Sequence, residues 1–329
     1  MDASIERAVR ALRDGQLVAF PTETVYGLGA NARDPAAVAR LYAVKGRPVD
    51  HPVIVHIASA ADLEAWAREI PAAARALAAR FWPGPLTLVL KRAAGVRDTI
   101  TGGQDTVAVR CPDHPLAHAL LTAAKAVGID GVVAPSANRF GRISPTTAAH
   151  VVDEFGDEIA AVLDGGPCAV GIESTIVDVS GGVPRVLRPG MITEEEVRDC
   201  VGDTSAAPAT AVPRVSGALP GHYAPRTPLE LVAGGHCAAR VAELVAQGHR
   251  VGVLARADTL ANCRSVARAR VAAQDPHDYA RELYAALREL DTSGCSWLLA
   301  ELPPGGPPWR GVLDRLQRAA RGSGTSMQH

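Results

Sequence analysis

Hydrophobic and polar positions follow two alternating patterns along the first 200 residues. Ile5, Val9 and Leu12 have the spacing of one face of a helix. Short apolar runs typical of buried strands recur at 17–20, 53–57, 86–91, 106–110, 132–136, 161–166, 174–179 and 184–188. Strand-like and helix-like stretches in this order predict an α/β domain with a large twisted mixed sheet over residues 1–201.

Three residue pairs mark the expected starts of helices. Asp34-Pro35 and Ser144-Pro145 each combine an N-cap residue with a proline at the first helical position. Thr193 and Glu196 have the spacing of a capping box, which predicts a short helix directly after Thr193.

The pattern changes at residues 202–228, which are rich in Pro, Gly, Ser and Ala and show no period. This composition predicts a linker, long enough to fold back as an active-site lid. Beyond it, strand-like and helix-like stretches alternate again, at 229–233, 236–248, 250–255, 276–290, 296–301 and 309–320. They predict a small Rossmann-like parallel α/β domain over 229–321, and the tail 322–329 is expected to be disordered.

Composition fits this two-domain organisation. The chain has 329 residues, of which 47% are hydrophobic and 21% charged, as in ordinary globular proteins. The charged start and the absence of a long apolar run predict a soluble, cytoplasmic protein without a membrane segment. A net charge of −1 argues against a nucleic-acid coat protein but leaves room for a local basic groove. Only three of the 34 basic residues are lysines: Lys45, Lys91 and Lys125.

Several common catalytic and metal-binding motifs are missing. The six cysteines contain no CxxC pair, and the chain has neither a P-loop nor a GxSxG elbow. Residues 27–32 fit GxGxxA but do not follow the preceding strand directly, which argues against a dinucleotide site. His114 and His118 are spaced i, i+4, yet a capped surface helix explains them equally well, so we predict no metal site of the protein's own.

Polar residues cluster in loops at the ends of the predicted strands. The clusters are residues 21–27, 45–48, 135–138, and 173–175 with 188–190. Ligands of open α/β sheets collect at such strand ends. Lys45 and Arg47 are separated by one glycine, so both cations can face a single anion such as a polyphosphate. Taken singly, each cluster is equally compatible with a solvated helix end or a turn.

Taken together, the clusters resemble a known family. The stretches are PTETVYGLGANA, KGRP, HPVIVHI, FWPGPLTLVLK, TVAVRCPDHP, APSANRFGRISPT, ESTIVDV, VLRPG and HYAPRTPL. They are similar to the YrdC-like family in its long two-domain form, the threonylcarbamoyl-AMP synthases. The resemblance implies that ATP, L-threonine and bicarbonate become threonylcarbamoyl-AMP and pyrophosphate, with Mg²⁺ arriving mainly through ATP. It also implies that a separate transferase complex passes the threonylcarbamoyl group to tRNA.

The resemblance also implies roles for individual residues. Lys45 and Arg47 are the expected catalytic pair. The nucleotide site is expected to comprise Tyr26, Lys45, Arg47, Ser136, Asn138, Ser144 and Arg188. The threonine pocket is expected to comprise Thr22, His56, Arg110, Ser136 and Ser174. Tyr223 is the expected lid residue. The sequence departs from many relatives at 216–221, where SGALPG replaces a longer basic stretch.

Two other functions remain open on sequence alone. One is an RNA-binding module with weak, salt-dependent RNA contact, although aromatic residues make up only 4% of the chain and stacking platforms are scarce. The other is a carbamoyl-adenylate-forming enzyme with a different substrate.

Overall fold

The computed structural model describes residues 2–204 and 212–324. The chain divides into two compact units. The first unit comprises 1–140 and 145–218, and the second comprises 141–144 and 219–329.

The predicted linker, 202–228, therefore contributes residues to both units. Residues 205–211 of the linker and 325–329 of the predicted disordered tail lie outside the described residues.

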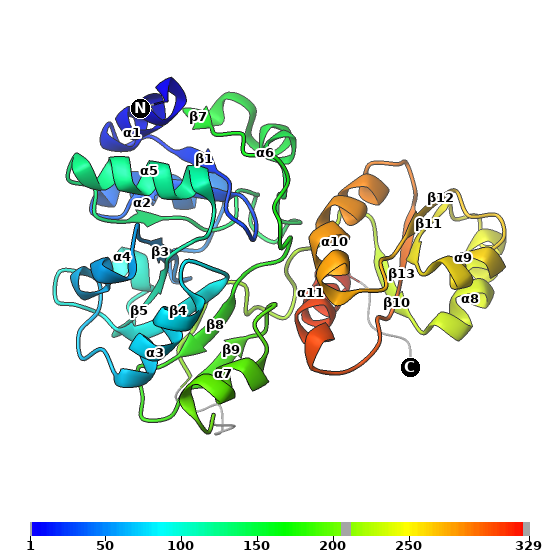
Figure 1. Ribbon diagram of the computed structural model, residues 1–329. Helices are drawn as coiled ribbons and strands as arrows, with labels where there is room; N and C mark the ends of the chain where they lie inside the picture. Colours follow the sequence, from blue (N-terminus) through cyan, green and yellow to red (C-terminus); the bar gives the residue numbers. More distant parts are fainter. Residues whose placement is uncertain (1, 205–211, 325–329) are drawn as a thin grey trace. The chain divides into compact units, whose positions relative to one another are not determined.

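A nine-stranded mixed sheet forms the centre of the first unit (Figure 1). Its order is β7-β1-β2-β6-β3-β5-β4-β8-β9. The strands are β1 (Val18–Phe20), β2 (Gly27–Asn31), β3 (Ile54–His56), β4 (Leu86–Lys91), β5 (Thr106–Arg110), β6 (Val132–Val133), β7 (Ala161–Val162), β8 (Thr175–Asp178) and β9 (Arg185–Arg188). Strands β3 and β5 pair in parallel, whereas β4 and β5 are antiparallel, so the predicted mixed sheet is confirmed.

Helices cover the two faces of this sheet unequally. On one face, α1 (Ala3–Arg13) and α5 (Pro115–Ala126) pack on the β1 and β6 region, where they bury Phe20 and Val132. The opposite face buries Val55 and Val109 in the larger core. The helices on that face are α2 (Pro35–Lys45), α3 (Ala72–Phe81) and α7 (Glu194–Val201). Shorter helices are α4 (Asp98–Thr101), α6 (Ala148–Phe155), η1 (Ala60–Ala65) and η2 (Gly156–Glu158).

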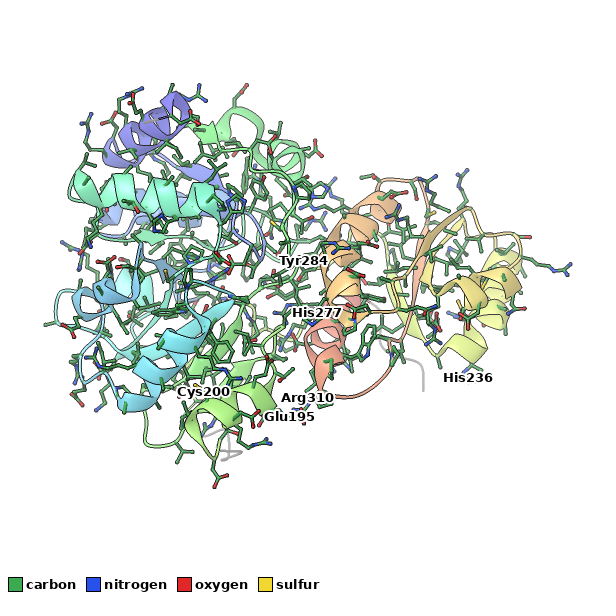
Figure 2. The ribbon with its side chains drawn as sticks, in the orientation of Figure 1. Glu195, Cys200, His236, His277, Tyr284 and Arg310 are labelled. Carbon is green, nitrogen blue, oxygen red and sulfur yellow. The ribbon has the colours of Figure 1, made fainter. Side chains whose placement is uncertain are left out.

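Two of the three predicted helix starts are confirmed. The Asp34 carboxylate accepts a hydrogen bond from Ala36 N at 2.8 Å, and Thr193 forms the expected capping box of α7, the helix that carries Glu195 and Cys200 (Figure 2). The prediction at Ser144 is wrong. The Pro145 carbonyl instead accepts from Tyr26 N, and helix α6 begins at Ala148 after a Thr147 cap.

The second unit is a four-stranded parallel sheet with order β10-β13-β11-β12. Its strands are β10 (Leu229–Val232), β11 (Val251–Ala255), β12 (Arg268–Val271) and β13 (Trp297–Glu301). Its helices are α8 (Gly234–Ala246), α9 (Ala257–Asn262), α10 (Pro276–Asp291), α11 (Arg310–Gly322) and the short η4 (Pro307–Trp309). Asp275 caps α10, which buries Tyr279, Leu283, Leu287 and Leu290. The predicted small parallel α/β fold is therefore confirmed.

Two strands, β2 and β12, are not predicted by the pattern of hydrophobic residues. Strand β2 contains Gly27 and Gly29 and lacks the β-branched residues typical of strands. A Cβ on Gly29 would stand only 2.9 Å from the Phe20 ring. These glycines therefore allow a close approach to Phe20 within a strand and do not form a turn. Strand β12 is an edge strand with mostly exposed residues, so it has no apolar run to reveal it. No described helix combines the length and apolar character that a membrane span requires.

Candidate active site

The candidate site lies on one face of the large sheet, across strands that are distant in sequence. His56 on β3 pairs with Arg110 on β5, and the register of β4 with β5 places Thr87 opposite Arg110. Directly opposite residues project from the same face of a sheet. The topology therefore brings three polar side chains from residues 54–110 into one buried row.

The next row on this face, two residues further along each strand, is apolar. Ile54, Ala108, Val89 and Ile176 form a small buried cluster there, and Val215 of the predicted linker packs against it. Side chains two residues apart in a strand share a face, so the polar and apolar rows are neighbours. The site thus occupies the part of this face between helices α1 and α5 and the segment that carries Val215.

Arg110 is held by two residues that the sequence analysis did not single out. Its guanidinium forms an ion pair with Glu23 at 2.6 Å and donates a hydrogen bond to the Thr24 hydroxyl at 2.8 Å. The other Glu23 oxygen accepts from Asp113 N at 3.0 Å. Both residues lie in loop 21–27, one of the polar clusters predicted from the sequence. Their pairing with Arg110 depends on the fold.

Thr22 shapes that same loop. Its hydroxyl donates to the Val25 carbonyl at 2.7 Å and accepts from the Thr24 and Val25 amides. These bonds within three residues form a tight polar turn, a usual role for threonine in loops. Thr22 therefore fixes the backbone that presents Glu23 and Thr24.

His56 is buried and uncharged at neutral pH. Burial and, to a smaller extent, the neighbouring Arg110 cation together lower the pKa of His56 to about 3. Its Nδ1 lies 3.3 Å from the Ile54 carbonyl, and its ring meets the edge of Phe20 with centroids 6.1 Å apart. The imidazole is thus a neutral hydrogen-bonding group beside the guanidinium.

Ser174 extends the row toward Arg188. Its hydroxyl lies 2.7 Å from that of Thr87, and Arg188 donates to both the hydroxyl and the carbonyl of Ser174. Arg188 is itself buried at the end of β9. Ser174 therefore connects the predicted threonine pocket with a predicted nucleotide-binding arginine.

Lys45 and Arg47 stand on either side of the residue that ends helix α2. Gly46 adopts φ +62°, a left-handed conformation that glycine tolerates best, and so lets the chain turn sharply between the two cations. Arg47 donates to the Pro52 carbonyl at 2.7 Å. Both cationic side chains are buried.

Lys45 joins this turn to the SAN loop, residues 136–138. Its ammonium donates to the carbonyls of Ser136 and Asn138. Burial, reinforced by the charge of Arg47, holds the pKa of Lys45 well below its usual range. An anion bound beside Lys45 would stabilise its charged form and so offset the effect of burial.

Ser216 lies between the two predicted phosphate-binding arginines. Arg47 donates to its hydroxyl at 3.3 Å, and Arg188 donates to its carbonyl at 2.8 Å. Nearby, Arg214 N donates to the Gln104 side chain at 2.7 Å. We call residues 213–216 the strap, because they cross the apolar row and reach the arginines. The sequence does not predict these contacts with Arg47 and Arg188, because they join positions far apart in the chain.

Three further predicted site residues lie outside the polar row and the Lys45–Arg47 turn. The Tyr26 hydroxyl donates to the Gly166 carbonyl at 2.8 Å, which holds loop 164–166, and burial raises its pKa to about 12. Ser144 is buried within 141–144 and belongs to the second unit. Tyr223 also belongs to the second unit, where its ring centroid lies 5.8 Å from that of Tyr284.

Chemically, the first unit joins a buried polar row suited to a small zwitterion with cations suited to a polyphosphate. No three His, Cys, Asp or Glu side chains within the described residues are grouped so as to hold a metal ion. A buried polar row beside buried cations is typical of nucleotide-dependent enzymes that activate a small polar substrate.

Comparison with known proteins specifies the class. A family profile described as telomere recombination matches residues 10–190, and one described as the C-terminal domain of threonylcarbamoyl-AMP synthase matches 192–321. The threonylcarbamoyl-AMP synthase of Pyrococcus abyssi is 42% identical, over 96% of this chain and 94% of its own. That of Bacillus subtilis is 39% identical, over 98% and 94%. A crystal structure of P. abyssi Sua5 complexed with L-threonine matches with a TM-score of 0.90 and 38% identity, over 99% of this chain and 96% of that one.

The chain belongs to the two-domain threonylcarbamoyl-AMP synthase family. The predicted family, fold and function are thereby confirmed, including the enzyme class of a nucleotidyltransferase that forms threonylcarbamoyl-AMP. The open alternatives of an RNA-binding module or another carbamoyl-adenylate synthase receive no support from these relatives.

Proposed function

We propose that the row formed by His56, Arg110 and Thr87 receives L-threonine, and that the cations beside it receive ATP. The observation that carries this proposal is the continuous hydrogen-bonded path from Thr87 through Ser174 and Arg188 to Ser216 and Arg47. This path supports an amino-acid pocket next to a polyphosphate site. The two substrates can then react without a protein nucleophile.

The chemistry proceeds in two steps. The threonine ammonium first loses a proton to solvent, the neutral amine then attacks the carbon of bicarbonate, and loss of water leaves a carbamate. A carbamate oxygen then attacks the α-phosphorus of ATP, and the bond to the β-phosphate breaks with release of pyrophosphate. The protein contributes orientation and charge stabilisation, which positioned cations and hydrogen-bond donors provide in a desolvated site.

For the nucleotide, we assign the phosphates to Lys45, Arg47 and Arg188. The carbonyls bound by Lys45 hold the SAN loop, so that Ser136 and Asn138 can contact the nucleotide. Ser144 and Tyr26 remain proposed contacts, and the Tyr26 bonds to loop 164–166 support a shaping role for that residue.

For threonine, we assign the carboxylate to Arg110, whose planar guanidinium suits a carboxylate. Glu23 then offers its carboxylate to the threonine ammonium, so the buried ion pair supplies one partner to each charge of a zwitterion. Neutral His56 and the hydroxyls of Thr22, Ser136 and Ser174 complete the proposed pocket. A neutral imidazole can accept a hydrogen bond from the substrate without repelling its ammonium group.

We propose that Mg²⁺ enters as part of the MgATP substrate. Phosphate oxygens are ligands that Mg²⁺ favours, and it commonly binds with only one or two carboxylates from a protein.

We also propose that the linker acts as a lid, with the strap as its fixed part. Val215 covers the apolar row, and Ser216 accepts hydrogen bonds from Arg47 and Arg188 where phosphate oxygens would compete for the same donors. Exclusion of water matters because the product is a mixed anhydride. Tyr223 remains the proposed lid residue of the second unit. Val215→Asp should release the strap and lower the yield of intact product per ATP consumed, whereas exposed Val183→Asp should not. An unchanged yield in Val215→Asp would contradict the lid.

The product is proposed to pass to a separate transferase complex that modifies tRNA, with at most weak RNA contact by this chain. Because tRNA and ATP meet in the cytoplasm, we place the reaction there.

Pyrophosphate release from MgATP and bicarbonate tests the proposal directly. We expect release that depends on L-threonine and is weaker with serine or glycine, which lack the methyl group or the whole side chain. A folded protein that binds ATP but releases no pyrophosphate with any amino acid would overturn the assignment.

A further inference from the structure

The second unit contains a cavity of about 240 Å³ that plays no part in the site described above. It opens at the carboxyl ends of three parallel strands. Its lining includes Arg256 after β11, Gln274 after β12 and Pro303 after β13, together with Tyr279 and Trp309. Every lining residue belongs to the second unit, so the cavity is complete within it.

The topology explains why a cavity forms here. Neighbouring strands β11 and β13 send their following helices to opposite faces: α9 lies with α8, and α11 lies with α10 (Figure 1). Connections that leave adjacent strands in opposite directions open a crevice at their carboxyl ends, where open α/β sheets bind ligands. The cavity occupies this position.

The place where such folds usually bind a phosphate is already filled. Strand β10 leads through Gly234 and Gly235 into α8, the helix that carries His236 (Figure 2). A Cβ on Gly234 would stand 2.2 Å from a Glu301 carboxylate oxygen. That carboxylate accepts from Arg256 N at 2.7 Å and from the Thr259 hydroxyl at 3.0 Å, and it is paired with the Arg256 guanidinium. A negatively charged ligand would meet this carboxylate instead of an empty anion site.

The remaining groups suit an uncharged ligand. The Tyr279 hydroxyl is buried and has no hydrogen-bond partner among the described residues, although its side chain lines the cavity. Trp309 packs against the Tyr279 ring nearly at right angles, with centroids 5.7 Å apart, and adds an aromatic wall. Alanine and proline side chains form most of the other walls. A buried phenol without a partner is costly unless a ligand completes it.

We propose that the second unit binds an uncharged planar molecule of nucleobase or nucleoside size in this cavity. The volume lies just below the range of about 300–1,000 Å³ usual for pockets that hold drug-sized ligands. Aromatic stacking and one or two hydrogen bonds at the ring edge would fix such a molecule. This site is separate from the proposed ATP site and needs no phosphate.

Fluorine NMR of the full-length protein labelled with 5-fluorotryptophan tests the proposal. The chain has four tryptophans, and a Trp309→Phe variant identifies the Trp309 resonance. The probes are adenosine, guanosine, cytidine and uridine, with AMP as the charged comparator. We expect at least one nucleoside to shift the Trp309 resonance saturably, while Trp297 at the far end of β13 stays unchanged. Trp66 and Trp82 report separately on the first unit.

Three variants decide whether the signal comes from the cavity. Tyr279→Phe, which keeps the ring, should weaken binding about tenfold through loss of one hydrogen bond. Ala273→Leu adds bulk to the cavity wall and should weaken binding at least tenfold, whereas Ala269→Leu on the exposed face of β12 should leave it unchanged. The proposal fails if no nucleoside shifts Trp309, if AMP binds more tightly than adenosine, or if Ala273→Leu has no effect.

Discussion

Cations at the proposed phosphate site and cations in the second unit have different partners. In the first unit, the Lys45 ammonium donates to two backbone carbonyls at the predicted nucleotide site. In the second unit, Arg240 is paired with buried Glu230 at 2.8 Å, and Arg256 is paired with buried Glu301. Carbonyls leave a net positive charge available to an anion, whereas carboxylates neutralise it.

This difference indicates which charges serve chemistry and which serve folding. A cation surrounded by neutral oxygens gains most when a phosphate arrives, so its removal should affect catalysis more than stability. A cation paired with a buried carboxylate should behave in the opposite way, because its loss strands an unpaired charge. Arg110 lies between these cases, since its partner Glu23 belongs to the proposed substrate pocket.

The largest expected effect is on catalysis at Lys45. Lys45→Met should lower the rate of threonine-dependent pyrophosphate release by at least about 100-fold, because both a phosphate contact and the hold on the SAN loop are lost. Thermal unfolding should change less than catalysis does, since methionine fills a similar volume and removes a buried charge, which offsets part of the cost of the two carbonyls left without a donor. Lys91→Met, at a half-exposed ion pair with Glu69, is the matched control and should retain activity. Equal losses of activity in Lys45→Met and Lys91→Met would contradict a specific catalytic role for Lys45.

The second unit should show the reverse response. Arg240→Met should destabilise that unit by about 3 kcal/mol, since Glu230 would remain buried without its partner. Threonine-dependent activity of the folded fraction should be unchanged at low temperature. Double replacement of Arg240 and Glu230 by Met and Leu should recover much of the stability, which calorimetry would measure. If the double variant is no more stable than the single one, the pair does not act as described.

Arg110 tests the intermediate case. Arg110→Lys should raise the KM for threonine about 10- to 100-fold, because one point charge replaces a bidentate fork, while the KM for ATP should change little. Glu23→Gln keeps the shape of the partner and should also raise the threonine KM. Steady-state kinetics with each substrate varied in turn separates the two sites. A larger change in the KM for ATP than for threonine would contradict the assignment of this row.

Much of the site could be anticipated from sequence, but its assembly could not. The family resemblance pointed to His56, Arg110 and Ser174, and the capped helices and most strands follow from local patterns. The order β3-β5-β4-β8 depends on long-range pairing that local periodicity does not contain. For that reason Thr87 was missed, although it completes the row.

Two failures have specific physical causes. Ser144 and Pro145 are residue types that commonly begin a helix. The Pro145 carbonyl, however, accepts a hydrogen bond from Tyr26 N, so the helix begins only at Ala148, after its Thr147 cap. Strand β2 is formed by glycines that approach the Phe20 ring closely, a tertiary requirement that overrides their low strand propensity. In both cases a contact distant in sequence decides the local structure.

The smallest expected effect concerns pH and His56, which differs from the cations because burial leaves it neutral. Its native pKa is about 3, against 6.5 for an unperturbed histidine, so between these values only the unfolded chain binds the proton. Stability should therefore be fully present above about pH 6.5 and fall as the pH drops toward 3, by up to about 1.4 kcal/mol per pH unit from this residue. His56→Gln should flatten the profile by that amount between pH 4.5 and 6.5, whereas His118→Gln on an exposed surface should preserve it. Calorimetry of the first unit at three pH values measures the slopes. Identical slopes for wild type and His56→Gln would mean that another group carries the pH dependence, and that the row beside Arg110 does not depend on a buried neutral imidazole.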